Sequence, residues 1–293
     1  MTNKIIIFAL TVLTFSACKK EDDLAIQSTT SQTDSKSITA PPTTFSQKLL
    51  LEIYSTASCA TSPDAELKYR NFALQHPDKM YGVCIHNNDA MANAQYSYLN
   101  NQLNIGSYAS GSFNRTPYNG AVVLPKTIWS SSIINNCLNK TSKCGLKISS
   151  SISGNLLTTK IYTGFNQPMN GNYFLTVYLM EDNVTGTGSG YNQANYYNNN
   201  SASPFYQLGN PIVGYSHSCV LRKVITASQG LSIPASSIQV GGTFAKSFSI
   251  DISNYNKANL YIIAFINKQG SSSITQEILN VQQVKAGQNK NWD

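Results

Sequence analysis

The feature that most constrains the fold is a strand–helix–strand pattern in the first third of the chain. Residues 48–54 and 80–86 are apolar runs too continuous for strands with one face in water, and such strands are typical of parallel sheets covered on both sides. Between them, residues 63–75 begin with proline and carry Asp64 and Glu66 in the first turn, which favours a helix. The pattern predicts a parallel α/β core with a right-handed crossover.

The turn between the first strand and the helix carries Cys59, within the stretch YSTASCATSP. Many thiol sites are built this way, because the helix dipole stabilises a thiolate and lowers its pKa. Such sites usually have a second cysteine three residues later, whose thiol releases the mixed disulfide formed by the first. Here that residue is Ser62, which excludes a two-electron dithiol cycle. Cys59 and Ser62 are therefore candidates for a monothiol reaction or for a structural role.

The second half of the chain has a different pattern. After two further expected helices, at residues 90–103 and 126–138, strand candidates alternate with Gly, Asn and Pro turns. These strand candidates are residues 147–153, 156–162, 173–180, 218–226, 244–252, 260–267 and 274–284. Several have apolar residues at every second position, which favours an antiparallel β-sandwich. We therefore expect an α/β domain at residues 45–144 and an immunoglobulin-like, all-β domain at residues 145–293.

One long segment, residues 185–207, interrupts the strand pattern with polar, aromatic and glycine residues. Loops of this length within compact domains are uncommon and are either functional or disordered. Its aromatic residues are Tyr191, Tyr196, Tyr197, Phe205 and Tyr206. Interleaved with asparagine, they are candidates for a surface that contacts a glycan or a partner protein. The alternative is that they pack their own loop.

The N-terminus predicts export and lipid attachment. Lys4 precedes a short apolar run at residues 5–13, which is typical of a signal peptide and too short to span a bilayer. Residues 15–18, FSAC, resemble a bacterial lipobox, in which the cysteine, here Cys18, is lipidated and becomes the mature N-terminus. We expect a signal peptide at residues 1–17 and a flexible tether at residues 18–44, which has little to bury.

Composition excludes several classes of function. Charged residues make up 12% of the chain, about half the usual share. Lysine and arginine are scattered singly apart from two adjacent pairs, so there is no basic stripe for nucleic acid. With three histidines and no H-E-x-x-H, P-loop or C-x-x-C motif, we expect no metal, no cofactor and no enzymatic activity.

Five of the six cysteines remain once Cys18 is lipidated. An odd number in an oxidising compartment leaves at least one thiol unpaired. Cys137 and Cys144 flank an expected helix end, and we expect a disulfide there that contributes roughly 2–3 kcal/mol to stability. The alternative is two separate thiols. Cys84 and Cys219 lie in apolar strands and are expected to be inert core residues.

Several stretches resemble the outer-membrane protein 28 family of Bacteroidetes lipoproteins. The resemblance runs from about Lys48 to the C-terminus. It is carried by LLLEIYSTASCATSP, YASGSFNR, YFLTVYLMEDNV, GYSHSCVLRKVIT, NLYIIAFI and EILNVQQV. It implies a thioredoxin-like fold for residues 45–144. The chain departs from that pattern twice, because Ser62 replaces the second cysteine and Ala109 stands where a thioredoxin-type cis-proline is expected.

The resemblance also implies a location and a role. Members of the family are described as surface proteins of adhesin or receptor type, and the KKEDD stretch after Cys18 resembles a signal for lipoprotein display on the cell surface. We therefore expect a surface-exposed outer-membrane lipoprotein, anchored through Cys18, that binds a protein or glycan ligand. The alternatives are a monothiol redox or thiol-trapping protein that uses Cys59, and a structural partner in a larger membrane complex.

Overall fold

The strand–helix–strand unit that the sequence predicts is present at the start of the fold. The structure, a computed structural model, describes residues 40–292. Strand β1 (Leu49–Ser55) pairs in parallel with β2 (Met80–His86), and helix α1 (Ser62–Gln75) connects them. Both strands are buried along their whole length, as their continuous apolar runs predict. The expected signal peptide, Cys18 and most of the expected tether lie outside the described residues.

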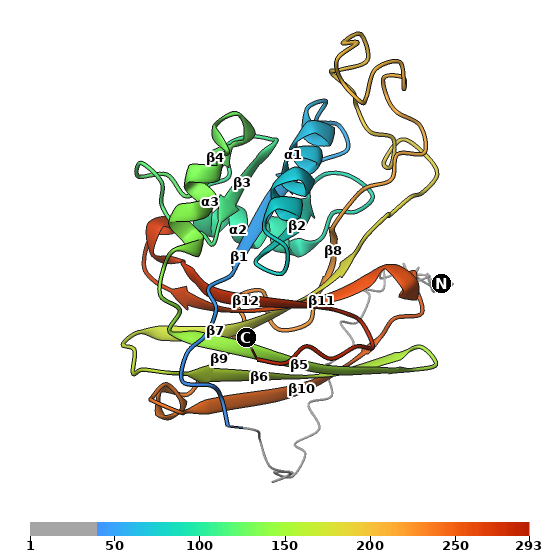
Figure 1. The fold of residues 1–293 in the computed structure, drawn as a ribbon. Coiled ribbons are helices and arrows are strands. Elements are labelled where there is room, and N and C mark those ends of the chain that lie inside the picture. Colours follow the sequence, from blue (N-terminus) through green and yellow to red (C-terminus); the bar gives the residue numbers. More distant parts are fainter. Residues whose placement is uncertain (1–39, 293) are drawn as a thin grey trace, which may run out of the picture. The chain divides into compact units, whose positions relative to one another are not determined.

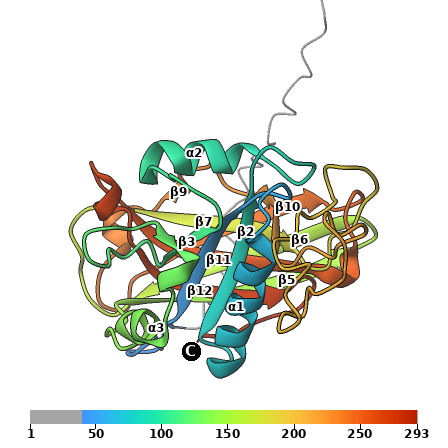
Figure 2. The same ribbon diagram turned by 90° about the horizontal axis from the view of Figure 1, so that it is seen from above.

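Two more helices complete the α/β part. Helix α2 (Ala94–Leu103) begins after Asn93, whose side chain accepts a hydrogen bond from the backbone N–H of Gln95. The helix expected at residues 126–138 is divided into a short 3-10 turn, η1 (Lys126–Ile128), and α3 (Ser131–Leu138). Helices α1 and α3 lie on one side of β1 and β2, and α2 lies on the other side (Figure 2).

The strands form one large sheet and one small sheet (Figure 1). The order in the large sheet is β12-β11-β7-β8-β2-β1-β3-β4, and β9 pairs with β7. Its other strands are β3 (Ser110–Phe113), β4 (Leu124–Pro125), β7 (Asn172–Glu181), β8 (Val220–Val224), β9 (Leu231–Ser232), β11 (Leu260–Gln269) and β12 (Ile278–Lys285). The small sheet contains β5 (Cys144–Ser153), β6 (Leu156–Phe165) and β10 (Thr243–Asp251). Short 3-10 turns lie at η2 (Ala235–Ser237), η3 (Lys257–Asn259) and η4 (Ser273–Thr275).

The large sheet crosses the boundary that the sequence predicts between two domains. Strand β8, from the second half of the chain, pairs in parallel with β2, from the first half, with Val220 opposite Cys84. The described residues, 40–292, accordingly form one compact unit. The fold is thus mixed α/β with a large and a smaller sheet and few helices. Separation into a thioredoxin-like domain and an immunoglobulin-like domain is not confirmed, because strands of both halves share one hydrogen-bonded sheet.

The two faces of the large sheet bury two separate hydrophobic clusters. The first is formed by the helices together with strands such as β1 and β2, and includes Leu50, Ile85 and Leu99. The second lies between the large and the small sheet and includes Ile161 and Ile262. Burying this apolar surface is the main favourable contribution to folding. Along β7 and β11 alternate residues belong to the two clusters, so the small sheet covers the face of these strands opposite to the first cluster.

A buried ion pair within the first cluster links β1 to the turn after β3, and a tyrosine from the second half of the chain donates a hydrogen bond to it. Arg115, in the turn after β3, donates from Nε and Nη2 to the two carboxylate oxygens of Glu52 on β1, both over 2.7 Å. Tyr178 on β7 donates its hydroxyl to the same carboxylate over 3.3 Å. Both charged side chains are nearly inaccessible to water. Within residues 40–292, no helix is long and apolar enough to cross a membrane.

Candidate functional site

The turn that carries Cys59 lies between the end of β1 and the start of α1. Its backbone is fixed by hydrogen bonds from the Cys59 N–H to the Thr56 carbonyl oxygen over 3.0 Å and from the Ser62 N–H to the Cys59 carbonyl oxygen over 3.1 Å. The Cys59 thiol is half-buried, and its sulfur lies 3.5 Å from the Thr61 hydroxyl oxygen. The structure therefore holds the thiol at the N-terminal end of α1, where the sequence places it.

Ser62 has a structural contact and is not placed as a second reactive group. It is buried, and its hydroxyl oxygen accepts a hydrogen bond from the Ser55 hydroxyl on β1 over 2.9 Å. The side chain thus links the first turn of α1 to the end of β1. Ala109 stands where a thioredoxin-type cis-proline is expected. It directly precedes β3, and the peptide bond between Tyr108 and Ala109 is cis.

The connection between β7 and β8, residues 182–219, covers the turn that carries Cys59; we call this connection the long loop. Ala194 donates its backbone N–H to the Ala57 carbonyl oxygen over 2.8 Å, and Tyr196 donates to the Ala60 carbonyl oxygen over 2.9 Å. The Gln193 side-chain amide donates to the carbonyl oxygen of Cys59 over 2.9 Å. One extended stretch of the long loop therefore lies along the whole turn, and a peptide that approached Cys59 would compete with it.

The long loop has little regular structure, but its own hydrogen bonds fix its shape. Gln193 and Ile212 exchange both backbone hydrogen bonds, over 3.1 and 2.7 Å. The buried Asn195 side chain donates to the carbonyl oxygens of Phe205 and Gly209, both over 2.9 Å. The polar side chains of this segment thus make the hydrogen bonds to the backbone that a neighbouring strand would make in a sheet.

The five aromatic residues singled out in the long loop have different environments. Phe205 is buried, and Tyr191 packs against a small apolar cluster that includes Ala57. Tyr197 is half-buried and its hydroxyl accepts a hydrogen bond from Lys126 over 2.8 Å. These three side chains pack the loop itself. Tyr196 is 74% exposed and Tyr206 is 39% exposed, so these two side chains are available to a ligand or partner.

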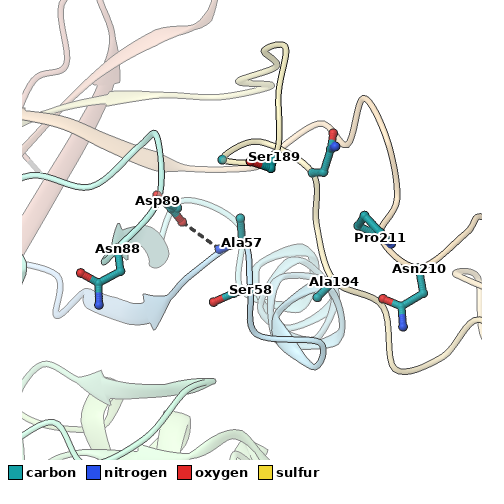
Figure 3. A pocket seen from close by; sticks show the side chains of 10 residues that line it. Ala57, Ser58, Asn88, Asp89, Ser189, Ala194, Asn210 and Pro211 are labelled. Atoms are coloured by element: carbon teal, nitrogen blue, oxygen red, sulfur yellow. Dashed lines mark hydrogen bonds between the residues drawn. The ribbon is translucent and has the colours of Figure 1, made fainter.

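A pocket of about 390 Å³ opens between the turn and the long loop (Figure 3). Its lining residues are Ala57, Ser58, Asn88, Asp89, Ser189, Gly190, Asn192, Ala194, Asn210 and Pro211. The Asp89 carboxylate accepts hydrogen bonds from the Ala57 N–H over 2.8 Å and the Met91 N–H over 2.9 Å, and it pairs with His86 Nδ1 over 2.7 Å. Partial burial acts to raise the pKa of Asp89, but His86 and the two N–H groups outweigh burial and lower it.

A cluster of buried titratable groups lies inside the protein near this turn, and sequence reasoning missed it. Glu66 on α1 accepts hydrogen bonds from the Tyr215 hydroxyl over 3.2 Å and the Ser218 N–H over 3.3 Å. Burial raises the pKa of Glu66 to about 7, against the opposing effects of His86 and these hydrogen bonds. The sequence signal was weak, because Glu66 reads as an ordinary acidic residue in the first turn of a helix.

The two histidines of this cluster come from distant parts of the chain. The rings of His86, at the end of β2, and His217, in the long loop, lie 5.5 Å apart edge to face. His217 Nε2 lies 2.9 Å from the carbonyl oxygen of Tyr191, and the ring is buried. Burial lowers the pKa of His217 to about 4. Within residues 40–292 no group of three or more His, Cys, Asp or Glu side chains is arranged to hold a metal ion.

The expected disulfide between Cys137 and Cys144 is not formed. Both are free thiols, as are Cys84 and Cys219. The reason is that α3 turns Cys137 into the first hydrophobic cluster, whereas Cys144 begins β5 and belongs to the second. Burial raises the pKa of Cys137 to about 11 and raises that of Cys144 further. These thiols are core residues like Cys84 and Cys219.

The fold and site define a class of protein: a mixed α/β protein in which a long, hydrogen-bonded loop covers a turn with one thiol. Comparison with known families then places the chain. The family model for outer membrane protein Omp28 matches residues 96–290, and the chain belongs to this family of outer membrane proteins. The match begins within α2 and therefore does not include the turn that carries Cys59.

Comparison with solved structures gives two matches. HBP35 of Porphyromonas gingivalis has 15% sequence identity and a TM-score of 0.65, and the alignment covers 83% of this chain and 76% of that chain. A protein of Agrobacterium tumefaciens has 12% identity and a TM-score of 0.49, with 85% of this chain and 98% of that chain covered. At these identities the likeness to HBP35 shows a shared fold alone. No curated protein sequence matches the chain.

Proposed function

We propose that this chain is a surface-exposed outer-membrane lipoprotein, anchored through Cys18, that binds a partner or ligand through its long loop. Family membership supports the outer-membrane location. The lipobox and the KKEDD stretch support the lipid anchor and the display on the cell surface. No enzymatic step is required of the site in this proposal.

The observation that carries the binding role is the exposure of large apolar side chains on a loop whose backbone is fixed. Val213 is 76% exposed and Leu208 is 52% exposed, in addition to Tyr196 and Tyr206. All four side chains belong to residues 196–213 of the long loop. Contiguous exposed apolar patches mark interaction sites, and tyrosine is enriched at interfaces. Because hydrogen bonds already order the long loop, the loop would lose little conformational entropy when a partner binds it.

The arrangement at Cys59 favours a binding role over redox chemistry. Ser62 is engaged with Ser55 and cannot resolve a mixed disulfide. The carbonyl oxygens of Ala57, Cys59 and Ala60 already accept hydrogen bonds from the long loop. The turn is thus used inside the protein, where it supports the loop that we propose as the contact surface.

A photo-crosslinking experiment on intact cells tests this proposal. A benzophenone amino acid is placed at position 196, in the long loop, and in a matched control at position 156, where Leu156 is 49% exposed on β6. We expect a discrete crosslinked product on intact cells from position 196 and none from position 156. Equal products at both positions, or none at either, would contradict binding through the long loop. Protease treatment of intact cells checks display, because a protein that is cleaved only after lysis is not on the surface.

A second candidate function is a monothiol reaction at Cys59. It is favoured by one observation, the half-buried thiol at the N-terminal end of α1, where a helix dipole stabilises a thiolate. The rate at which an alkylating reagent modifies Cys59 as a function of pH tests it. A midpoint well below the ordinary thiol value of about 8.5 would support this function, and an ordinary midpoint would remove it.

A further inference from the structure

We propose that the pocket between the Cys59 turn and the long loop binds a neutral, polyhydroxylated ligand of the oligosaccharide class. The inference deepens the proposed function and rests on it, because it names the chemistry of a ligand for the same loop. It is carried by the lining of the pocket, by the state of its single carboxylate and by the rigidity of its walls.

The pocket is built from three segments that are distant in the sequence. Ala57 and Ser58 come from the turn before Cys59, Asn88 and Asp89 follow β2, and the remaining lining residues belong to the long loop (Figure 3). Its volume of about 390 Å³ lies within the usual range for small-molecule sites. A site of this size accommodates a short sugar segment better than the side of a folded protein.

The lining offers hydrogen-bonding groups without free charge. The side chains of Asn88, Ser189 and Asn192 make no hydrogen bond to any residue in the described part of the chain, and all three residues line the pocket. Each asparagine amide has an NH₂ group that donates and an oxygen that accepts, and the serine hydroxyl can both donate and accept. Sugar hydroxyls are also both donors and acceptors, so neighbouring hydroxyls of one ring match this set. Among the lining residues there is no lysine, arginine or histidine.

Asp89, the one charged lining residue, favours neutral over anionic ligands. Both carboxylate oxygens of Asp89 already accept protein hydrogen bonds, from Ala57 and Met91, and one also pairs with His86. This carboxylate is therefore a fixed part of the wall, and its lowered pKa keeps it ionised. A sulfated or sialylated sugar would bring a second negative charge next to Asp89, with no cation in the lining to offset the repulsion.

The walls of the pocket are held together before a ligand arrives. Ala90 donates to the Gly190 carbonyl oxygen over 3.3 Å, and Ala194 donates to that of Ala57 over 2.8 Å. The Asn210 side chain accepts a hydrogen bond from the Asn195 N–H over 2.9 Å. Such preorganisation reduces the entropy lost on binding, which matters for a sugar, whose hydroxyls must give up hydrogen bonds to water.

The test uses the full-length protein on an array of neutral, sulfated and sialylated oligosaccharides, followed by calorimetry with the strongest neutral binder. We expect binding to neutral oligosaccharides and weaker binding to their anionic derivatives. Asn192→Ala and Asn88→Ala should each raise the Kd about fivefold, as expected for the loss of a ligand hydrogen bond. Asn199→Ala removes an exposed asparagine of the same loop outside the pocket and should leave the Kd unchanged.

Three results would overturn the inference: no neutral oligosaccharide bound at millimolar concentration, a preference for anionic sugars, or a Kd that Asn192→Ala and Asn88→Ala leave unchanged. Thermal unfolding of each variant controls for misfolding. The crosslinking experiment at position 196 separates this outcome from the proposed function. A crosslinked partner together with a negative array removes the sugar site and retains the binding role, whereas failure of both experiments removes both.

Discussion

The backbone N–H of Ala194 donates to the carbonyl oxygen of Ala57 over 2.8 Å, and this contact attaches the long loop to the turn that carries Cys59. The same attachment lays the loop along the backbone of that turn and places Ala57 and Ala194 in the lining of the pocket. One piece of backbone pairing therefore connects the turn that carries Cys59 with the pocket beside it.

Loosening this attachment should expose the thiol. Gln193→Ala removes the side-chain donor to the Cys59 carbonyl oxygen, and we expect Cys59 to be alkylated severalfold faster, measured by mass spectrometry after timed iodoacetamide treatment. Gln75→Ala, an exposed change at the end of α1, is the matched control and should leave the rate unchanged. An unchanged rate in Gln193→Ala would mean that the loop does not limit access.

Glu66 should make the protein less stable as the pH rises towards neutrality. Burial raises its pKa from about 4.5 in the unfolded chain to about 7 in the folded protein, so the folded state binds the proton more tightly. The contribution of Glu66 to the free energy of unfolding is therefore full below pH 4.5 and is lost as the pH rises through 7. The loss is at most roughly 3 kcal/mol. Glu66→Gln keeps an oxygen that accepts from Tyr215 and should flatten this dependence.

Urea unfolding between pH 4.5 and 8 measures the effect. His217 acts in the opposite direction at lower pH, because burial lowers its pKa to about 4 and stability is lost as the pH falls from about 6.5 towards 4. The comparison of wild type with Glu66→Gln isolates the carboxyl group. Parallel pH profiles for the two proteins would show that Glu66 is not the titrating group.

The buried Glu52–Arg115 pair should be costly to break on one side. Arg115→Met leaves the Glu52 carboxylate buried without its partner, and we expect a loss of about 3–5 kcal/mol in the free energy of unfolding. The double variant Glu52→Gln, Arg115→Met should lose clearly less. Glu277→Gln breaks an exposed pair with Lys140 and should cost under about 1 kcal/mol. Equal losses for the single and double variants would argue against an uncompensated buried charge.

All five cysteines of the folded body should be free. We expect five alkylations per chain when the protein is unfolded in denaturant without a reductant, because Cys59, Cys84, Cys137, Cys144 and Cys219 are all unbonded. Intact mass before and after reduction measures this number. Two alkylations that are missing before reduction and present after it would instead support the disulfide expected from the spacing of Cys137 and Cys144.

Local patterns in the sequence determined the first elements of the fold. Continuous apolar runs specify β1 and β2, a proline with acidic residues specifies the start of α1, and period-two alternation specifies several later strands. The position of Cys59 and the loss of its usual partner at Ser62 also follow directly from the order of residues. In each case the signal lies within a few neighbouring residues, where backbone geometry and burial act directly.

Only the tertiary structure decided which distant segments meet. The parallel contact of Val220 with Cys84 makes the large sheet continuous across the expected domain boundary. The same chain path brings His217 to His86, lays Ala194 along Ala57 and places Cys137 and Cys144 in different clusters. These contacts depend on how the sheet closes over its core and not on local propensity. The sequence by itself therefore indicated the thiol turn, whereas the loop that covers it, and the pocket beside it, exist only in the folded chain.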